Sequence, residues 1–306
     1  MPRALQFGGG RHALPVSSAL SPPLERPMRT ILLAAVLSSS LLALGATAAT
    51  KAPAAKGDAA LDAAIHGAWR DPKNVARDIY RHPKQTLTFF HVRNDATVIE
   101  ITPPPGWYSE ILAPYLHDNG QYIAAVIDPA SQADAKNRDY YQKNRDQLQQ
   151  KFDADKAHYD RAKMVAFDPK APVFGPAKSA DVVLTFRNVH NWRMAGTAPQ
   201  MFKGFFEVLK PGGVLGVVEH RAKADVADND KTGYVGQAQL IAMAKAAGFV
   251  LDGQSEINAN PRDTKDYPGG VWTLPPTNSH DAKDDAKYKA IGESDRMTLR
   301  FVKPRA

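Results

Sequence analysis

Seven short apolar runs, separated by segments of helical periodicity, constrain the fold of this chain more than any other feature. The runs are TVIEI (97–101), QYIAAVID (121–128), KMVAFD (163–168), ADVVLTF (180–186), VLGVVEH (214–220), FVLDGQSEI (249–257) and MTLRFVK (297–303). They lack a strict alternation of apolar and polar residues, which indicates strands with both faces buried. Helices are expected over 107–116, 131–163, 201–213 and 237–249. Strands that alternate with helices predict an α/β fold with a mainly parallel sheet and helices on both faces.

Two further regions complete the fold prediction. Short helices are expected over 59–70 and 72–82, the second with Val75, Ile79 and Tyr80 on its apolar side. A long loop rich in Pro, Asn and Asp is expected over 258–295, where it would cover a site at the edge of the sheet and help to select its ligand.

The N-terminal segment has the composition of a targeting signal. From Met28, one positive residue precedes an apolar core that ends at Leu44, and a small-residue cleavage pattern follows at 46–48. The core is shorter than the roughly 20 apolar residues of a membrane span. We expect a secretory signal peptide cleaved after Ala48, and a periplasmic or secreted protein without stable membrane insertion. An uncleaved anchor is the alternative.

Three regions are therefore expected along the chain. Residues 1–49 hold an upstream extension and the signal peptide, with Met28 as the expected start. Residues 50–85 hold a linker and the N-terminal helices, and residues 86–306 hold the α/β domain.

Composition excludes several classes of site. The 306-residue chain has a formal net charge of +7, but its Lys and Arg residues are scattered among acids. This pattern favours a solvated basic surface over nucleic-acid binding. The chain has no cysteine, which excludes disulfides, thiolate metal sites and cysteine nucleophiles.

Polar residues follow five consecutive predicted strands at the points where the strands end. They are Glu100, Asp128, Asp168, Arg187, Asn188, His190, Glu219, His220 and Arg221. Each one alone could be a solvated loop residue. In a parallel sheet, however, these positions meet at one edge, where ligands bind near the reversal of strand order. The set therefore predicts a ligand site at that edge.

The segment TPPPG (102–106) stands where nucleotide-binding α/β proteins carry several glycines. Asp128 lies 22 residues after Gly106, the spacing of an acid that accepts hydrogen bonds from ribose hydroxyls. The spacing favours a nucleoside-containing ligand, and the prolines argue against an ordinary phosphate loop.

Several motifs resemble those of class I S-adenosylmethionine-dependent methyltransferases over about residues 86–303. They are VIEITPPPGWYSEILAPYL, GQYIAAVIDP, SADVVLTFRNVHNW, FEVLKPGGVLGVVEHR and AKAAGFVL. Details such as RNVHNW, EHR, NPRDT, VWTLPP and SDRMTLRF are similar to a bacterial predicted-methyltransferase family whose members often carry signal peptides.

The resemblance implies a Rossmann-like, seven-stranded sheet with an antiparallel last strand, and S-adenosylmethionine as the cofactor. It also implies roles for residues at the strand ends. Glu100 and Gly106 would flank the methionine part, and Thr102 between them is also expected to bind the cofactor. Asp128 would hold the ribose, Phe167 and Asp168 would border the adenine, and Arg187, Asn188 and His190 would lie near the sulfonium.

The proline-filled loop departs from the Gly-rich pattern of that family. Proline has no N–H and cannot adopt a left-handed conformation, so fewer backbone donors remain for a carboxylate. S-adenosylmethionine contains no phosphate and therefore needs fewer backbone donors from this loop. We therefore expect a modified cofactor loop with weakened binding, and an ordinary turn without a ligand is the alternative.

Two functions follow from these observations. The first is a methyltransferase that acts on a small acceptor, with catalysis mainly by orientation and with His190 as the candidate base. A metal site of His190, Glu219 and His220 is conceivable, but the spacing matches no dedicated motif and we predict no metal.

The second function is a non-catalytic binding or accessory protein of the cell envelope, because export removes the chain from the cytosol, where S-adenosylmethionine is made.

Overall fold

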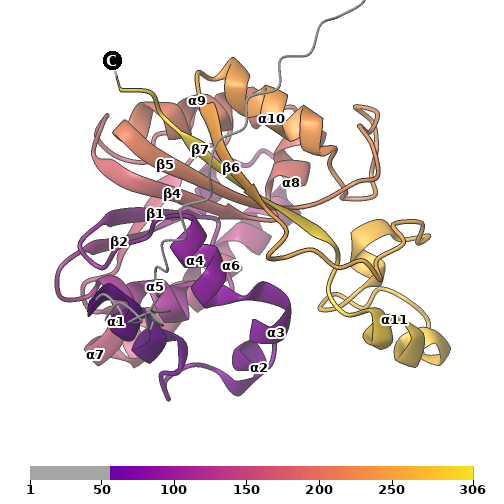
Figure 1. Cartoon of the computed structure of the whole chain (residues 1–306), viewed down its shortest axis with the longest axis horizontal. Coiled ribbons are helices and arrows are strands. Elements are labelled where there is room, and N and C mark those ends of the chain that lie inside the picture. Colours follow the sequence, from indigo (N-terminus) through magenta and orange to yellow (C-terminus); the bar gives the residue numbers. More distant parts are fainter. Residues whose placement is uncertain (1–55, 306) are drawn as a thin grey trace, which may run out of the picture. The chain divides into compact units, whose positions relative to one another are not determined.

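Seven strands pair into one sheet, in the order β3-β2-β1-β4-β5-β7-β6, in the computed structural model, which describes residues 56–305 (Figure 1). The strands are β1 (Thr97–Ile101), β2 (Gln121–Ile127), β3 (Lys163–Phe167), β4 (Ala180–Phe186), β5 (Leu209–His220), β6 (Val250–Ser255) and β7 (Arg296–Val302). All seven predicted strands are confirmed. β7 runs antiparallel to β5 and β6, and the other pairs are parallel.

Helices cover both faces of the sheet, as predicted (Figure 1). They are α1 (Lys56–Ile65), α2 (Pro72–Val75), α3 (Asp78–Arg81), α4 (Pro83–Phe89), α5 (Ser109–Leu116), α6 (Ala135–Ala154), α7 (Lys156–Tyr159), α8 (Val189–Met194), α9 (Ala198–Val208), α10 (Gln237–Ala246) and α11 (Asp285–Ile291). Buried residues of α1 and of α4 to α7 belong to the apolar cluster on one face. Those of α8, α9 and α10 belong to the cluster on the other face.

Strand residues alternate between these two apolar clusters. In β1, Val98 packs in the first cluster, while Ile99 and Ile101 pack in the second. In β4, Leu184 packs in the first cluster and Val183 in the second. Successive side chains of a strand point to opposite faces, so a sheet covered on both sides needs apolar residues at nearly every position. The continuous apolar runs of the sequence have this cause.

Some element boundaries differ from those predicted. The helix expected over 131–163 is divided into a 3-10 turn at 129–131, α6 and α7, because the backbone leaves the helical region at Asp155 (φ −138°). The loop expected over 258–295 contains two 3-10 turns and α11. The six-residue helix α8 was not predicted, because so short a helix carries little periodicity.

The expected apolar side of the second N-terminal helix is wrong. Val75 and Ile79 are exposed at 42% and 68%, and the segment forms two single turns, α2 and α3. Arg81 is the buried residue of α3 instead, with its guanidinium 4.7 Å from the ring centre of Trp107. A charged residue faces inward here because the protein supplies it with a carboxylate and an aromatic face.

A glycine in the middle of β5 sets how closely α4 approaches the sheet. A Cβ atom at Gly216 would lie 2.6 Å from Cγ of Phe90 and 2.8 Å from Cδ2 of Leu184. Phe90 directly follows α4 and is fully buried. The missing side chain therefore leaves the space in which the N-terminal helices dock onto the strands.

The predicted signal peptide, its anchor alternative and the linker up to residue 55 lie outside the described residues. Within residues 56–305, no helix combines the length and apolar character that a membrane crossing requires.

We predict that Gly216→Ala destabilises the protein, because the added methyl group overlaps two buried side chains. Overpacking of this kind costs about 1–3 kcal/mol in the free energy of unfolding, measurable by urea denaturation. Gly253→Ala in the outer strand β6 is the matched control, since its nearest neighbours lie at 3.2 Å or beyond. Equal losses in the two variants would contradict the packing explanation.

Candidate functional site

Two cavities meet at the carboxyl ends of β1 and β4, the neighbouring strands between which the strand order reverses. Thr102 and Pro104 from the turn after β1, and Asn188 after β4, line both cavities. Asn188 donates hydrogen bonds from its side-chain amide to the carbonyl of Ile101 (3.0 Å) and to Oγ1 of Thr185 (3.2 Å). The bond to Ile101 ties the two strand ends together, and the bond to Thr185 orients the side chain within the end of β4. The two cavities thus lie at the sheet edge where the sequence predicts a ligand site.

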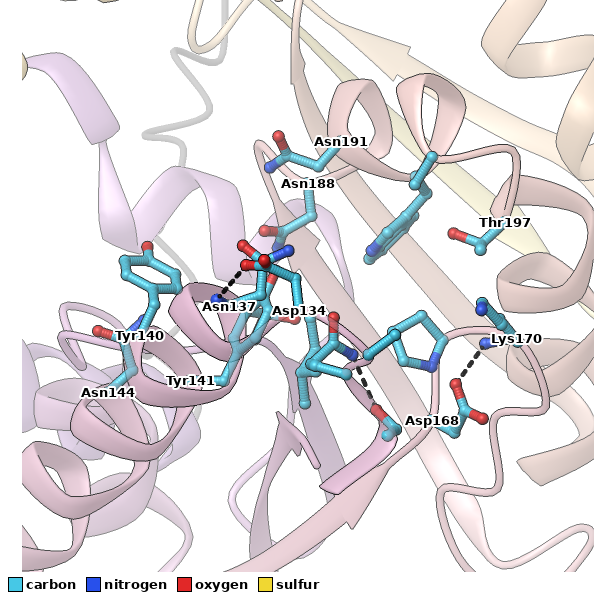
Figure 2. Close-up of a pocket in the computed structure, with 18 of the residues that line it drawn as sticks. Asp134, Asn137, Tyr140, Tyr141, Asn144, Asp168, Lys170, Asn188, Asn191 and Thr197 are labelled. Atoms are coloured by element: carbon cyan, nitrogen blue, oxygen red, sulfur yellow. Dashed lines mark hydrogen bonds between the residues drawn. The ribbon is translucent and has the colours of Figure 1, made fainter. Parts of the chain in front are cut away.

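The first cavity, called the polar cavity, has a volume of about 430 Å³. Figure 2 shows Tyr140, Tyr141 and Asn144 of α6 on one side and Asp168 and Lys170 on the other. Further lining residues are Gln132 and Asp134 before α6, Asn137 in α6, Asn191 and Trp192 in α8, and Thr197 just before α9. Amides, hydroxyls and aromatic rings thus converge on one hollow, which suits a flat heterocycle with several hydrogen-bonding groups.

The second cavity, called the arginine cavity, has a volume of about 400 Å³ on the other side of the TPPPG turn. Arg77 and Arg81 reach it from the N-terminal helices, and Arg187 reaches it from the end of β4. Its remaining lining residues are Glu100, Ile101, Thr102, Pro103, Pro104, Pro105, Trp107, Tyr108, Phe186, Asn188 and Pro276. Its walls are therefore prolines and aromatic rings, and most of its charge is positive.

Two residues beside these cavities adopt left-handed backbone conformations although they are not glycine. Thr102 has φ +55° and Arg187 has φ +62°. This backbone geometry is strained for a β-branched residue such as Thr102, and strain of this kind concentrates at functional sites. Oγ1 of Thr102 is buried and has no hydrogen-bond partner among the described residues. A polar atom left in this state at the junction of the two cavities is suited to a ligand group.

The TPPPG turn presents its prolines to the cavities and turns its glycine away. Pro103, Pro104 and Pro105 line the arginine cavity, whereas Gly106 lines neither cavity. Gly106 has φ +93°, and a Cβ atom there would lie 3.1 Å from Cδ1 of Leu148 in α6. The glycine is needed for the turn and for the packing of α6, and its role beside the methionine part of a cofactor stays a prediction.

Three residues with predicted cofactor roles take different places. Asp168 lines the polar cavity. Asp128 lies beside it without lining it, and its Oδ1 accepts a hydrogen bond from the amide of Ala130 (3.0 Å) at the start of a 3-10 turn. Phe167 is buried in the core, 4.9 Å from the ring of Phe174. The ribose role of Asp128 and the adenine role of Phe167 stay predictions.

Glu100 is a buried carboxyl group on the wall of the arginine cavity. Tyr122 donates a hydrogen bond to its Oε2 (2.7 Å), and Ser109 lies at 3.4 Å. Burial raises the pKa of Glu100 to about 7, although these bonds and the charges of Arg187 and Arg81 favour the ionised form. Near neutral pH, Glu100 is therefore protonated in part of the molecules and ionised in the others.

Burial raises the pKa of Glu100, but it lowers the pKa of two arginines of this cavity. The pKa of Arg187 is lowered to about 10 by burial and by the charge of Arg296. Burial and the charge of Arg187 also lower the pKa of Arg81. A guanidinium stays protonated in proteins at neutral pH, so these shifts express an unfavourable crowding of positive charge.

His190, the predicted base, does not line either cavity. Its Nδ1 lies 3.0 Å from Oε1 of Glu219, and its ring lies against His220 (5.3 Å between ring centres) and Trp272 (5.9 Å). Burial, followed by the charge of His190, holds the pKa of His220 well below its usual value. The role of His190 as a base stays a prediction.

His190, Glu219 and His220 do come together, with one potential ligand atom each within 4.8 Å. The Glu219 carboxylate, however, already accepts hydrogen bonds at both oxygens. Val189 N donates to Oε2 (2.6 Å) and His220 N donates to Oε1 (2.8 Å), in addition to the contact with His190. This arrangement satisfies the first amides of α8. We assign Glu219 to capping this helix.

Sequence reasoning missed the residues that α6 and the N-terminal helices bring to the site. Tyr141 of α6 packs partly against the apolar core and also lines the polar cavity. Arg77 and Arg81 stand four residues apart, and this spacing was the available signal for a shared face. Nothing in the local sequence connects them to a turn that follows β1.

Comparisons of the sequence with protein-family models and with curated proteins yield no match. Among solved structures, the chain is similar to the [4+2]-cyclase SpnF, with a TM-score of 0.51 and 15% identity over 74% of this chain and 81% of that chain. A SAM-dependent methyltransferase from Aquifex aeolicus matches with a TM-score of 0.48 and 11% identity, over 76% of this chain and 94% of that one. At such identities the likeness concerns the fold alone. The chain has the Rossmann-like fold of class I methyltransferases, with the strand arrangement that the motifs predicted.

We predict that Glu100→Gln changes how stability depends on pH. Because the pKa of Glu100 is higher in the folded state than in the unfolded state, its contribution is fully present below about pH 4.5 and is lost as pH rises through about 7. A pKa difference of this size corresponds to roughly 3 kcal/mol in the free energy of unfolding. Glutamine does not titrate, so the variant should not show this loss. Urea denaturation at pH 5 and pH 8 should show a relative gain for the variant at pH 8.

The control for this measurement is Glu207→Gln, since Glu207 is an exposed glutamate in α9. Its stability difference from the parent protein should not vary between the two pH values. A Glu100→Gln variant that follows the parent at both pH values would show that Glu100 titrates normally.

Proposed function

We propose that the chain is an S-adenosylmethionine-dependent methyltransferase that acts on a small acceptor. The observation that carries this proposal is the pair of cavities at the reversal of strand order, joined at Thr102, Pro104 and Asn188. Open α/β sheets bind their ligands at this place. The fold supports the same reaction class, although a fold by itself does not determine an activity.

The described residues fit the proposed cofactor. The polar cavity offers Tyr141, Asp168 and Asn191 to a nucleoside, and the partnerless Oγ1 of Thr102 lies where its amino-acid part would begin. Asp128 stands beside the polar cavity with one carboxylate oxygen committed to a backbone amide and the other available for ribose hydroxyls. S-adenosylmethionine, when bound, supplies an electrophilic methyl group.

The protein's own part in such a transfer is mainly placement. The TPPPG prolines line the junction of the cavities and present apolar rings to the region where transfer would occur. Asn188 joins the ends of β1 and β4 through its hydrogen bond to Ile101, and its bond to Thr185 orients the amide. A bimolecular displacement gains most of its acceleration from such positioning.

The proline turn also motivates the second candidate, a non-catalytic binding or accessory protein. Gly106 does not face a cavity, and prolines replace backbone donors at the turn. Export of the chain through its N-terminal segment, which we also propose, would separate it from the cytosolic cofactor pool. This candidate predicts an occupied cleft without methyl transfer.

Titration calorimetry of the full chain with S-adenosylmethionine and with its demethylated product tests the proposal. We expect micromolar dissociation constants and a loss of at least about tenfold in Asp128→Ala, because a charge-assisted hydrogen bond is worth roughly 1.5–3 kcal/mol. Asp153→Ala, in the last turn of α6 and exposed, is the control and should bind as the parent does. Absence of heat with both compounds would favour the accessory protein.

A further inference from the structure

The arginine cavity carries more positive charge than its surroundings neutralise. Four guanidinium groups lie in and behind its wall, those of Arg77, Arg81, Arg187 and Arg296. A single carboxylate, Glu293, accepts hydrogen bonds from three of them: from Nε of Arg77 (2.7 Å), from Nε of Arg81 (3.3 Å) and from Nη2 of Arg296. Even with Glu100 ionised, two positive charges remain uncompensated.

Among the described residues, Arg187 is the arginine of this group without an ion-pair partner, and the carboxylates of Glu293 and Glu100 act on it only at longer range. Its guanidinium makes no hydrogen bond and no ion pair with any residue between 56 and 305, although it lines the cavity. Nη2 of Arg77 is also buried without a partner. By contrast, the buried Arg70 forms a two-point pair with Asp78 at 2.7 and 2.9 Å. Arg187 is partly buried, so an unpaired guanidinium at this position costs stability.

The proposed cofactor does not remove this excess. S-adenosylmethionine carries a sulfonium, an ammonium and one carboxylate, so its arrival adds net positive charge to the region. A second, negatively charged molecule beside it would be attracted by both the cofactor and the arginines. Planar guanidinium groups match the geometry of carboxylate and phosphate oxygens and bind them through paired N–H donors.

We infer that the arginine cavity binds an oxyanion group of the methyl acceptor, a phosphate or a carboxylate, with Arg187 and the free N–H groups of Arg77 as its donors. This inference rests on the proposed function and names the class of its substrate. The apolar rings of Trp107, Tyr108 and Phe186 would then contact the uncharged part of the acceptor. Exclusion of water by these rings and by the prolines strengthens the ionic contact.

The test uses the full chain, with inorganic phosphate and succinate as separate probes at fixed ionic strength. Calorimetric titrations are made with and without saturating S-adenosylhomocysteine, the demethylated cofactor. We expect one or both probes to bind in its presence at least as tightly as in its absence. The probe that binds more tightly identifies phosphate or carboxylate as the preferred group.

The variant Arg187→Met separates a binding role from a structural one. It should weaken binding of the probe by about tenfold or more, as expected for loss of a charged hydrogen-bond donor. Its melting temperature should be equal to or higher than that of the parent, because no partner is lost and charge crowding is relieved. Arg300→Met is the control, since Arg300 pairs with Asp252 on β6 and lines neither cavity.

Several outcomes would overturn the inference. Failure of both probes to bind while S-adenosylhomocysteine binds would leave the proposed function standing without an anionic acceptor. Competition between the probe and S-adenosylhomocysteine would assign the arginines to the carboxylate of the cofactor. Binding of the probe without any binding of S-adenosylhomocysteine would overturn the proposed function, and the assignment to an acceptor with it.

Discussion

The burial of both faces of one sheet is the constraint on which the rest of the structure depends. Helices must lie on each side of the strands, so β2 and β3 are added on one side of β1, and β4 and the later strands on the other. The strand order therefore reverses between β1 and β4. At that point no helix crosses directly over the strand ends, and a hollow remains. The turn after β1 and the segment after β4 occupy its rim, which explains why Thr102, Pro104 and Asn188 belong to both cavities.

Electrostatics distinguishes the two cavities more clearly than shape does. The polar cavity is lined by amides, hydroxyls and two acids. The arginine cavity is lined by guanidinium groups and by Glu100, which is partly protonated near neutral pH. Glu293 holds the N-terminal helices to the start of β7 through Arg77, Arg81 and Arg296, residues far apart in the sequence. The same carboxylate thus links the N-terminal helices to β7 and partly neutralises three of the arginines at the cavity.

The proline turn illustrates how a loop can keep its place in a fold while its chemistry changes. A Gly-rich loop offers backbone donors and a close approach to its ligand. Here Gly106 serves the turn and the packing of α6, and the prolines form an apolar cover. Under the proposed function, ligand contacts would come from side chains such as Arg187 and Asn188, which directly follow β4, in place of the backbone of the loop.

The sequence by itself determined the strands, their mainly parallel arrangement and the edge at which polar residues collect. Apolar runs and strand-end residues are local signals, so Glu100, Asp168 and Asn188 could be placed at this edge without coordinates. Only the tertiary structure decided which side chains face a cavity. It buried Phe167 in the core, placed His190 against Trp272, and brought Arg81 across the sheet edge to the turn after β1. These outcomes depend on packing between segments distant in sequence, such as α4 over Gly216, and no local pattern specifies such contacts.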